Sequence, residues 1–156
     1  MSVYKLDGLN ANNERRQRFI SVFASEAISK GDVVAFDLAA TEPTNGYGNH
    51  VLICDTGDQL NRHAIGVAFE AIASGAKGII QVAGYCDYAK CDSGISDSGD
   101  EGDVLVAGAE AGEFEKLDSS GAEAAGGDTI PCALLIEYGT DGTADSIVYL
   151  LNPANL

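Results

Sequence analysis

The sequence predicts an all-β protein: a compact β-sandwich or barrel-like domain of many short strands, preceded by an extended N-terminal arm. Short runs rich in β-branched and aromatic residues recur along the 156 residues, and such side chains suit a pleated surface. Turn residues, among them many of the 19 glycines, separate these runs at short intervals, as in sandwiches and barrels. The apolar fraction of 46% is enough for a real hydrophobic core.

The chain divides into an arm, residues 1–18, and a β-domain, residues 19–156. The first 13 residues are polar and rich in asparagine, with Tyr4 and Leu6 among a few scattered apolar side chains. Residues 14–18 then hold three of the nine basic residues of the whole chain. Two compatible interpretations stay open: a disordered terminus, or an arm that orders against a partner and places its cations on an acidic surface.

The expected strands follow one another from residue 19 onward. In chain order they span 19–24, 33–36, 51–54, 64–73, 79–88, 104–107, 114–117, 130–138 and 146–151. A helix competes for 64–73, because alanine favours helices. A hairpin is the favoured interpretation, since Gly75 and Gly78 can supply the positive φ angles of a reversal before a β-branched strand. Pro131 stands near a strand start, where its missing donor costs least.

A faint internal echo links the two halves of the chain. The segment KGDVVA at 30–35 resembles EGDVLV at 101–106. The following apolar strands match as IGVAFE at 65–70 with IPCALL at 130–135. Each half then closes with a β-branched strand, IIQV at 79–82 or IVYL at 147–150. A duplication accounts for this echo, and so do two separate hairpins that use the same turn chemistry.

The net charge of −15, from 24 acidic and nine basic residues, limits the partners. Nucleic-acid binding depends on neutralising phosphates with Lys and Arg, so we expect no nucleic-acid partner. The same charge repels anionic lipid, and no apolar run approaches the roughly 18 residues of a membrane span. The N-terminus lacks the pattern of a secretory signal, so we expect synthesis in a cytoplasm.

No motif of catalysis or cofactor binding is present. A hydrolase needs a nucleophile beside a base, and the only histidines, His50 and His63, lie outside any such motif. The chain also lacks the phosphate-binding glycine loops of nucleotide enzymes. We therefore expect no enzyme activity and no cofactor.

Metal binding is not expected either. The loop 92–103 holds five carboxylates suited to Ca²⁺, but its spacing fails the EF-hand pattern, which favours a solvated turn cluster. Cys86 and Cys91 are too far apart for the usual zinc pair, and a zinc site would have to recruit Cys54 or a histidine. The four cysteines, including Cys132, are expected to be reduced, buried thiols.

Five segments together resemble a known family. They are AISKGDVVAF, HAIGVAFEAIASGAKGIIQVAGYC, GDEGDVLVAG, DTIPCALLIEYG and SIVYLLNP. In this order they resemble the capsid decoration (cement) proteins of tailed bacteriophages, over roughly residues 19–151. One departure is that Pro131 and Cys132 stand where the second "IGVA" element would have Gly and Val.

The resemblance implies a homotrimer on the outer surface of an icosahedral phage head, made in the bacterial host cytoplasm. There it would bind the major capsid protein and stabilise contacts between its subunits. In this hypothesis Arg15, Arg16 and Arg18 meet carboxylates of the capsid, and Tyr4 and Leu6 fill apolar pockets.

The alternative hypothesis is a carbohydrate- or host-receptor-binding head fibre module. Such a module would use tyrosine rings for stacking, and Tyr47, Tyr85 and Tyr88 are the candidates.

Overall fold

A computed structural model describes residues 17–38, 49–55, 63–92, 95, 101–117, 130–139 and 143–151. Within these ranges the chain forms strands and turns without any helix, which confirms the predicted all-β class and leaves no helix that could span a membrane. The strands are β1 (Arg18–Ala24), β2 (Val33–Phe36), β3 (His50–Ile53), β4 (Ala64–Ala68), β5 (Lys77–Ala89), β6 (Val104–Ala107), β7 (Phe114–Lys116), β8 (Ala133–Glu137) and β9 (Ser146–Leu150).

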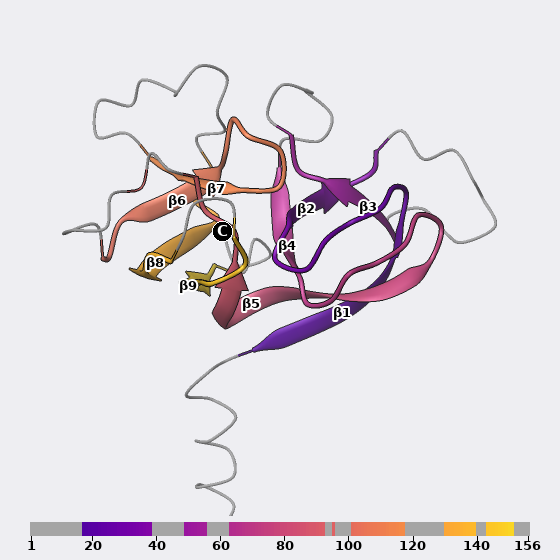
Figure 1. Ribbon diagram of the computed structural model, residues 1–156, viewed down its shortest axis with the longest axis horizontal. Helices are drawn as coiled ribbons and strands as arrows, with labels where there is room; N and C mark the ends of the chain where they lie inside the picture. Colours follow the sequence, from indigo (N-terminus) through magenta and orange to yellow (C-terminus); the bar gives the residue numbers. More distant parts are fainter. Residues whose placement is uncertain are drawn as a thin grey trace, which may run out of the picture.

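The first five strands form a closed barrel (Figure 1). Their order is β1–β3–β2–β4–β5, and an antiparallel pairing of β5 with β1 closes the ring. β1 and β3 run parallel, while all other neighbours are antiparallel. Alternate side chains point inward, as the two-residue period of a strand requires. The buried residues of the interior are Val22, Ala24, Ile28, Val34, Val51, Ala68, Ile72, Ile80 and Val82.

The long strand β5 belongs to two barrels. Its first half pairs with β1 as far as Ala83, and its second half pairs with β9 from Gly84 onward. Gly84 has a φ of 88°, a left-handed conformation that glycine adopts without the steric cost of a Cβ atom. The change of partner therefore coincides with a bend that only glycine accommodates readily.

The second half of β5 starts a second ring of five strands. It continues through β9, β8, β6 and β7, and a parallel bridge between Cys91 and Phe114 connects β7 back to the chain just after β5. In the first barrel, β3 is joined to the end of β1 by the parallel pair of Ala24 and Val51. The second ring thus repeats the topology of the first, with the end of β5 in the place of β1.

Hydrogen bonds show that the sequence echo is a structural repeat. The Gly31 amide donates to the Ala68 carbonyl, and the Ala68 amide donates to the carbonyl of the next residue, Asp32. Gly102 and Leu135 make the same reciprocal pair in the second barrel, where the Leu135 amide donates to the Asp103 carbonyl. Two unrelated hairpins would not reproduce these bonds together with the order of five strands.

The repeat corrects one alignment made from the sequence. Leu135 occupies the place of Ala68, so Ala133 and Leu134 correspond to Gly66 and Val67. The match of 65–70 with 130–135 was therefore wrong by two residues. Residues 131 and 132 precede the strand, and the apparent departure at Pro131 disappears, because that residue does not occupy the Gly position.

The connection between β4 and β5 also differs from the expectation in part. The helical alternative for 64–73 is wrong, because β4 ends at Ala68 and Ile72 forms an isolated bridge with Ile28. Gly75 has the predicted positive φ, at 76°, but Gly78 does not. A Cβ at Gly78 would lie 2.5 Å from the Ile72 side chain, so this glycine makes room for packing rather than for a turn.

Candidate functional site

A row of four side chains crosses the outer face of the first barrel. The cross-strand pairs of Phe19 with Gln81, Gln81 with Val67, and Val67 with Val33 define it. Gln81, Val67 and Val33 are 0% exposed, although they point away from the interior of their own barrel. The second barrel covers them, and Val33 and Val67 belong to its hydrophobic cluster. Phe19, at the end of the row, is 41% exposed. We call the other three side chains the covered face.

The buried amide of Gln81 joins the two barrels. Its Nε2 donates to the carbonyls of Ala83 (3.1 Å) and Tyr85 (2.8 Å), and its Oε1 accepts from the Tyr88 hydroxyl. Buried polar groups require such partners, so this network sets how β5 crosses from one barrel to the other. Burial, and then the neighbouring Cys86 thiol, raise the pKa of Tyr88, which keeps its hydroxyl a donor.

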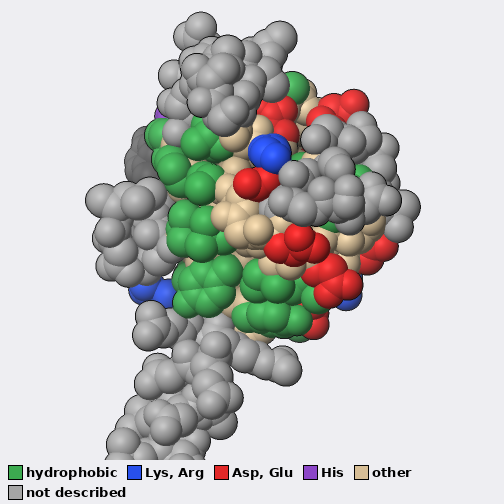
Figure 2. Space-filling view, turned by 90° about the vertical axis from the view of Figure 1, so that its left-hand side faces the viewer, with side chains coloured by type: hydrophobic (Ala, Val, Ile, Leu, Met, Phe, Trp, Pro, Cys, Tyr) green, Lys and Arg blue, Asp and Glu red, His purple; other side chains and the backbone are tan. Residues whose placement is uncertain are grey.

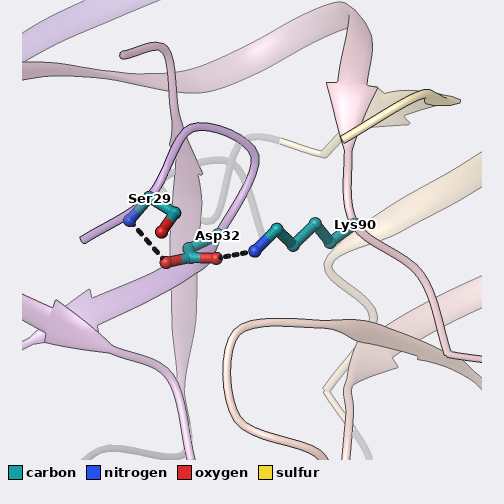
Figure 3. A network of polar contacts seen from close by, with 3 residues as sticks. All are labelled: Ser29, Asp32 and Lys90. Atoms are coloured by element: carbon teal, nitrogen blue, oxygen red, sulfur yellow. Dashed lines mark hydrogen bonds and ion pairs between the residues drawn. The ribbon is translucent and has the colours of Figure 1, made fainter. Parts of the chain in front are cut away.

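The Gly31–Asp32 turn fixes the same interface at the other end of the row (Figure 3). Asp32 Oδ1 lies 2.6 Å from the Lys90 ammonium, and Asp32 Oδ2 accepts from the Ser29 amide at 2.7 Å. A Cβ at Gly31 would lie 2.5 Å from both Ala144 Cβ and the Tyr88 carbonyl oxygen. The two barrels therefore meet closely at this turn.

The repeat places an equivalent row on the outside of the second barrel. The pairs of Tyr85 with Tyr149, Tyr149 with Leu134, and Leu134 with Val104 define it. All four side chains are partly exposed, in contrast with the 0% of their three buried counterparts. The turn beside the row is open too, because a Cβ at Gly102 would meet no atom of the described residues within 4 Å. We call this row the second-barrel face.

Figure 2 looks onto the side of the molecule that carries β6, β8 and β9. Apolar side chains form a continuous band there, and acidic side chains lie beside it. Ile136 on β8, next to the row, is 40% exposed. An apolar band with a charged border is the usual appearance of an interaction surface.

The structure places one of the five predicted capsid-binding residues. Arg18 is exposed and is the first residue of β1, opposite Ala83. Just before it, the Gln17 Nε2 donates to the Tyr85 carbonyl at 2.8 Å, so the chain enters the barrel beside the second-barrel face. The other four, Tyr4, Leu6, Arg15 and Arg16, lie outside the described residues, and the division into arm and domain stays a prediction.

The three tyrosines of the alternative hypothesis do not form one site among the described residues. Tyr85 is partly exposed in the second-barrel face, whereas Tyr88 is 5% exposed and hydrogen-bonded to Gln81. Tyr47 lies outside the described residues. Tyr149 and Leu134 were not predicted from the sequence, although an alignment of the two repeats in the correct register makes them equivalent to the buried Gln81 and Val67.

The thiols match the expected role of small buried hydrophobic groups. All four cysteines are buried thiols outside any disulfide bond. Burial raises the pKa of Cys86 to about 11 and that of Cys91 to about 12, so both are neutral near pH 7. Among the described residues, no group of three or more His, Cys, Asp or Glu side chains is arranged to hold a metal ion. Most of the acidic loop 92–103 lies outside those residues.

Comparisons with known proteins give a distant structural similarity. No family model matches the chain, and no curated protein matches it. Among solved structures, the chain is similar to the N-terminal base of the head fibre protein gp8.5 of bacteriophage phi29. The two share 13% sequence identity at a TM-score of 0.48, over 85% of this chain and 93% of that one.

Proposed function

We propose that the protein is a structural virion component, a decoration protein that binds the outer surface of an icosahedral phage head as a homotrimer. It stabilises contacts between subunits of the major capsid protein and catalyses no reaction. The five segments that resemble decoration proteins support this proposal. Synthesis in the host cytoplasm agrees with the buried thiols outside any disulfide bond.

The second-barrel face is the observation that carries the proposal. Its four side chains are apolar or aromatic, come from four neighbouring strands, and are partly exposed. Three of the four equivalent positions on the first barrel, Gln81, Val67 and Val33, are 0% exposed. A surface of this kind favours association with another macromolecule, which is the work of a structural protein.

Attachment to the head is assigned to the arm. In this proposal Tyr4 and Leu6 enter apolar pockets of the capsid protein, and Arg15, Arg16 and Arg18 pair with its carboxylates. Arg18 is exposed where β1 begins, so it is available for such a contact. The cations of the arm would face the head, while the remaining acidic surface keeps the protein soluble.

The test uses heads of the encoding phage that lack this protein. The full chain should bind them saturably in a sedimentation assay and raise the temperature at which they release DNA. Deletion of residues 1–16 combined with Arg18→Glu should abolish binding, and Lys77→Glu is the control, since Lys77 is an exposed cation outside the arm. Absence of binding by the full chain, or full binding without the arm, would overturn the proposal.

A second candidate is a glycan- or receptor-binding head fibre module. The neighbouring rings of Tyr85 and Tyr149, both partly exposed on adjacent strands, favour it, because sugars stack on such rings. Binding to host cells or to a glycan panel that Tyr149→Ala removes, without binding to heads, would select this candidate. Neither candidate depends on the similarity to the phi29 head fibre base.

A further inference from the structure

We propose that the second-barrel face is covered by the first barrel of a second copy of this chain, in a head-to-tail contact. The contact would repeat between molecules the packing that the two barrels show within one molecule. This inference rests on the self-association in the proposed function, and it assigns that association to a surface. The arm and the capsid protein take no part in it.

The repeat supplies the main argument. The three positions of the covered face, Gln81, Val67 and Val33, lose all exposure beneath the following barrel of the same chain. Their counterparts Tyr149, Leu134 and Val104 are side chains of the same or greater apolar character, and they are partly exposed. A third barrel would complete the series, and the strands of the described residues form two.

The adjacent turns show the same contrast. At Gly31 a Cβ would strike Ala144 and the Tyr88 carbonyl, because the second barrel approaches this turn directly. At Gly102, the equivalent residue, φ is 92° and no atom of the part of the chain that the structure describes lies within 4 Å of the same position. The Gly102 turn beside the second-barrel face thus has the same left-handed backbone conformation as the Gly31 turn, and it leaves space for a neighbouring molecule.

The repeat also indicates which surface provides the cover. Within the chain, the second barrel contributes Lys90 and Gly112, next to its parallel bridge, to the contact with Asp32 and Val33. The residues next to the corresponding parallel pair of the first barrel are Phe23 and Asn49. A second copy would therefore present the end of its first barrel.

That end carries suitable side chains. The Phe23 ring stacks on His50, with centroids 5.6 Å apart, and both residues are partly exposed. The His50 Nε2 is buried without a hydrogen-bond partner among the described residues. A neighbouring molecule would supply an apolar surface for the exposed part of the Phe23 ring.

A head-to-tail contact uses two different surfaces, and it closes into a ring when the rotation between successive copies divides a full turn. The homotrimer of the proposed function requires a rotation of one third of a turn. Three copies would place six barrels in succession, with each second barrel against the next first barrel. Stable interfaces bury about 1,200–2,000 Å² in total, more than four side chains provide. The contact must therefore extend to neighbours such as Ile136 and the Gly102 turn.

Salt distinguishes this contact from attachment through the arm. Each copy carries a net charge of −15, so copies repel one another, and added salt should strengthen an apolar contact between them. An arginine-mediated contact with a capsid carboxylate should weaken under the same change. The salt concentration therefore separates self-association of the protein from its attachment to the capsid.

Sedimentation velocity of the full chain, in low and high salt, tests the proposal with three variants. The parent should sediment as a trimer, more completely in high salt. Leu134→Glu and Phe23→Glu should each sediment as a monomer with an unchanged far-UV spectrum. Ile79→Glu is the matched control, because Ile79 is 39% exposed on the outside of the first barrel and outside both surfaces; it should remain a trimer.

A mixture of the two monomeric variants tests the head-to-tail geometry. The Leu134→Glu variant retains the end of its first barrel, and the Phe23→Glu variant retains its second-barrel face. These two intact surfaces can contact each other, so the mixture should form a heterodimer. A monomeric parent, a trimeric Leu134→Glu variant, or a mixture that stays monomeric would overturn the inference. Loss of the trimer when residues 1–16 are deleted would assign the face to the arm instead. Head binding is measured separately, so its failure would leave these results standing.

Discussion

Replacement of Gly31 by alanine should destabilise the protein more than the same replacement at its repeat counterpart, Gly102. Both residues have left-handed φ angles, 87° and 92°, so alanine costs about 1–2 kcal/mol of backbone strain at either position. Only at Gly31 does the added Cβ lie 2.5 Å from Ala144 Cβ and from the Tyr88 carbonyl oxygen. Overpacking of this kind costs about 1–3 kcal/mol more.

Urea unfolding of both variants measures this difference. The Leu134→Glu chain is the suitable background, because self-association then contributes nothing to the free energy of unfolding. The expected loss is roughly 2–5 kcal/mol for Gly31→Ala and about 1–2 kcal/mol for Gly102→Ala. At about 2–4 °C per kcal/mol, the melting temperatures should differ by roughly 2–12 °C. Equal losses at the two glycines would refute the close contact between the barrels.

Three further predictions concern buried polar groups. Lys90→Met leaves the Asp32 carboxylate, 5% exposed, without its cation and should cost about 1–3 kcal/mol in urea unfolding; an unchanged midpoint would contradict this. Burial raises the pKa of the Glu115 carboxyl group in the folded protein. The contribution of this group to stability is therefore present below the pKa that it has in the unfolded chain, and it is lost as the pH rises through the pKa that it has in the folded protein. Glu115→Gln should therefore raise the free energy of unfolding at pH 7 by up to about 1 kcal/mol, and this gain should disappear in acid, where the Glu115 carboxyl is protonated. An equal gain at pH 7 and in acid would argue against burial of the charge as the cause. Cys86 and Cys91 should resist iodoacetamide at pH 8 in the native state and react in urea, whereas rapid native labelling would show that they are accessible.

The strands were predictable because their signals are local. Runs such as 33–36 and 104–107 combine β-branched side chains with a preceding Gly-Asp turn, and the structure places β2 and β6 at these positions. The repeat was visible for the same reason. The register of the repeat was not predictable, because apolar residues of the two repeats also match when the segment IPCALL is shifted by two residues. The hydrogen bond from the Leu135 amide to the Asp103 carbonyl selects the correct alignment.

The candidate surface was less predictable, because exposure depends on tertiary packing. From the sequence, Gln81 looks like a polar residue that points to solvent. It is 0% exposed, and its Oε1 accepts a hydrogen bond from the Tyr88 hydroxyl. Tyr149 and Leu134 look like core residues and are partly exposed instead. No local pattern distinguishes these cases, since the difference arises from the second barrel lying against the first.

Electron cryomicroscopy of phage heads with and without this protein would show whether it binds the capsid as a homotrimer. We expect extra density on the outer surface of the head that has threefold symmetry and fits six small barrels per trimer, with an extended segment leading from each copy to the capsid. Heads that are identical with and without the protein, or density of single, unassociated copies, would contradict this expectation.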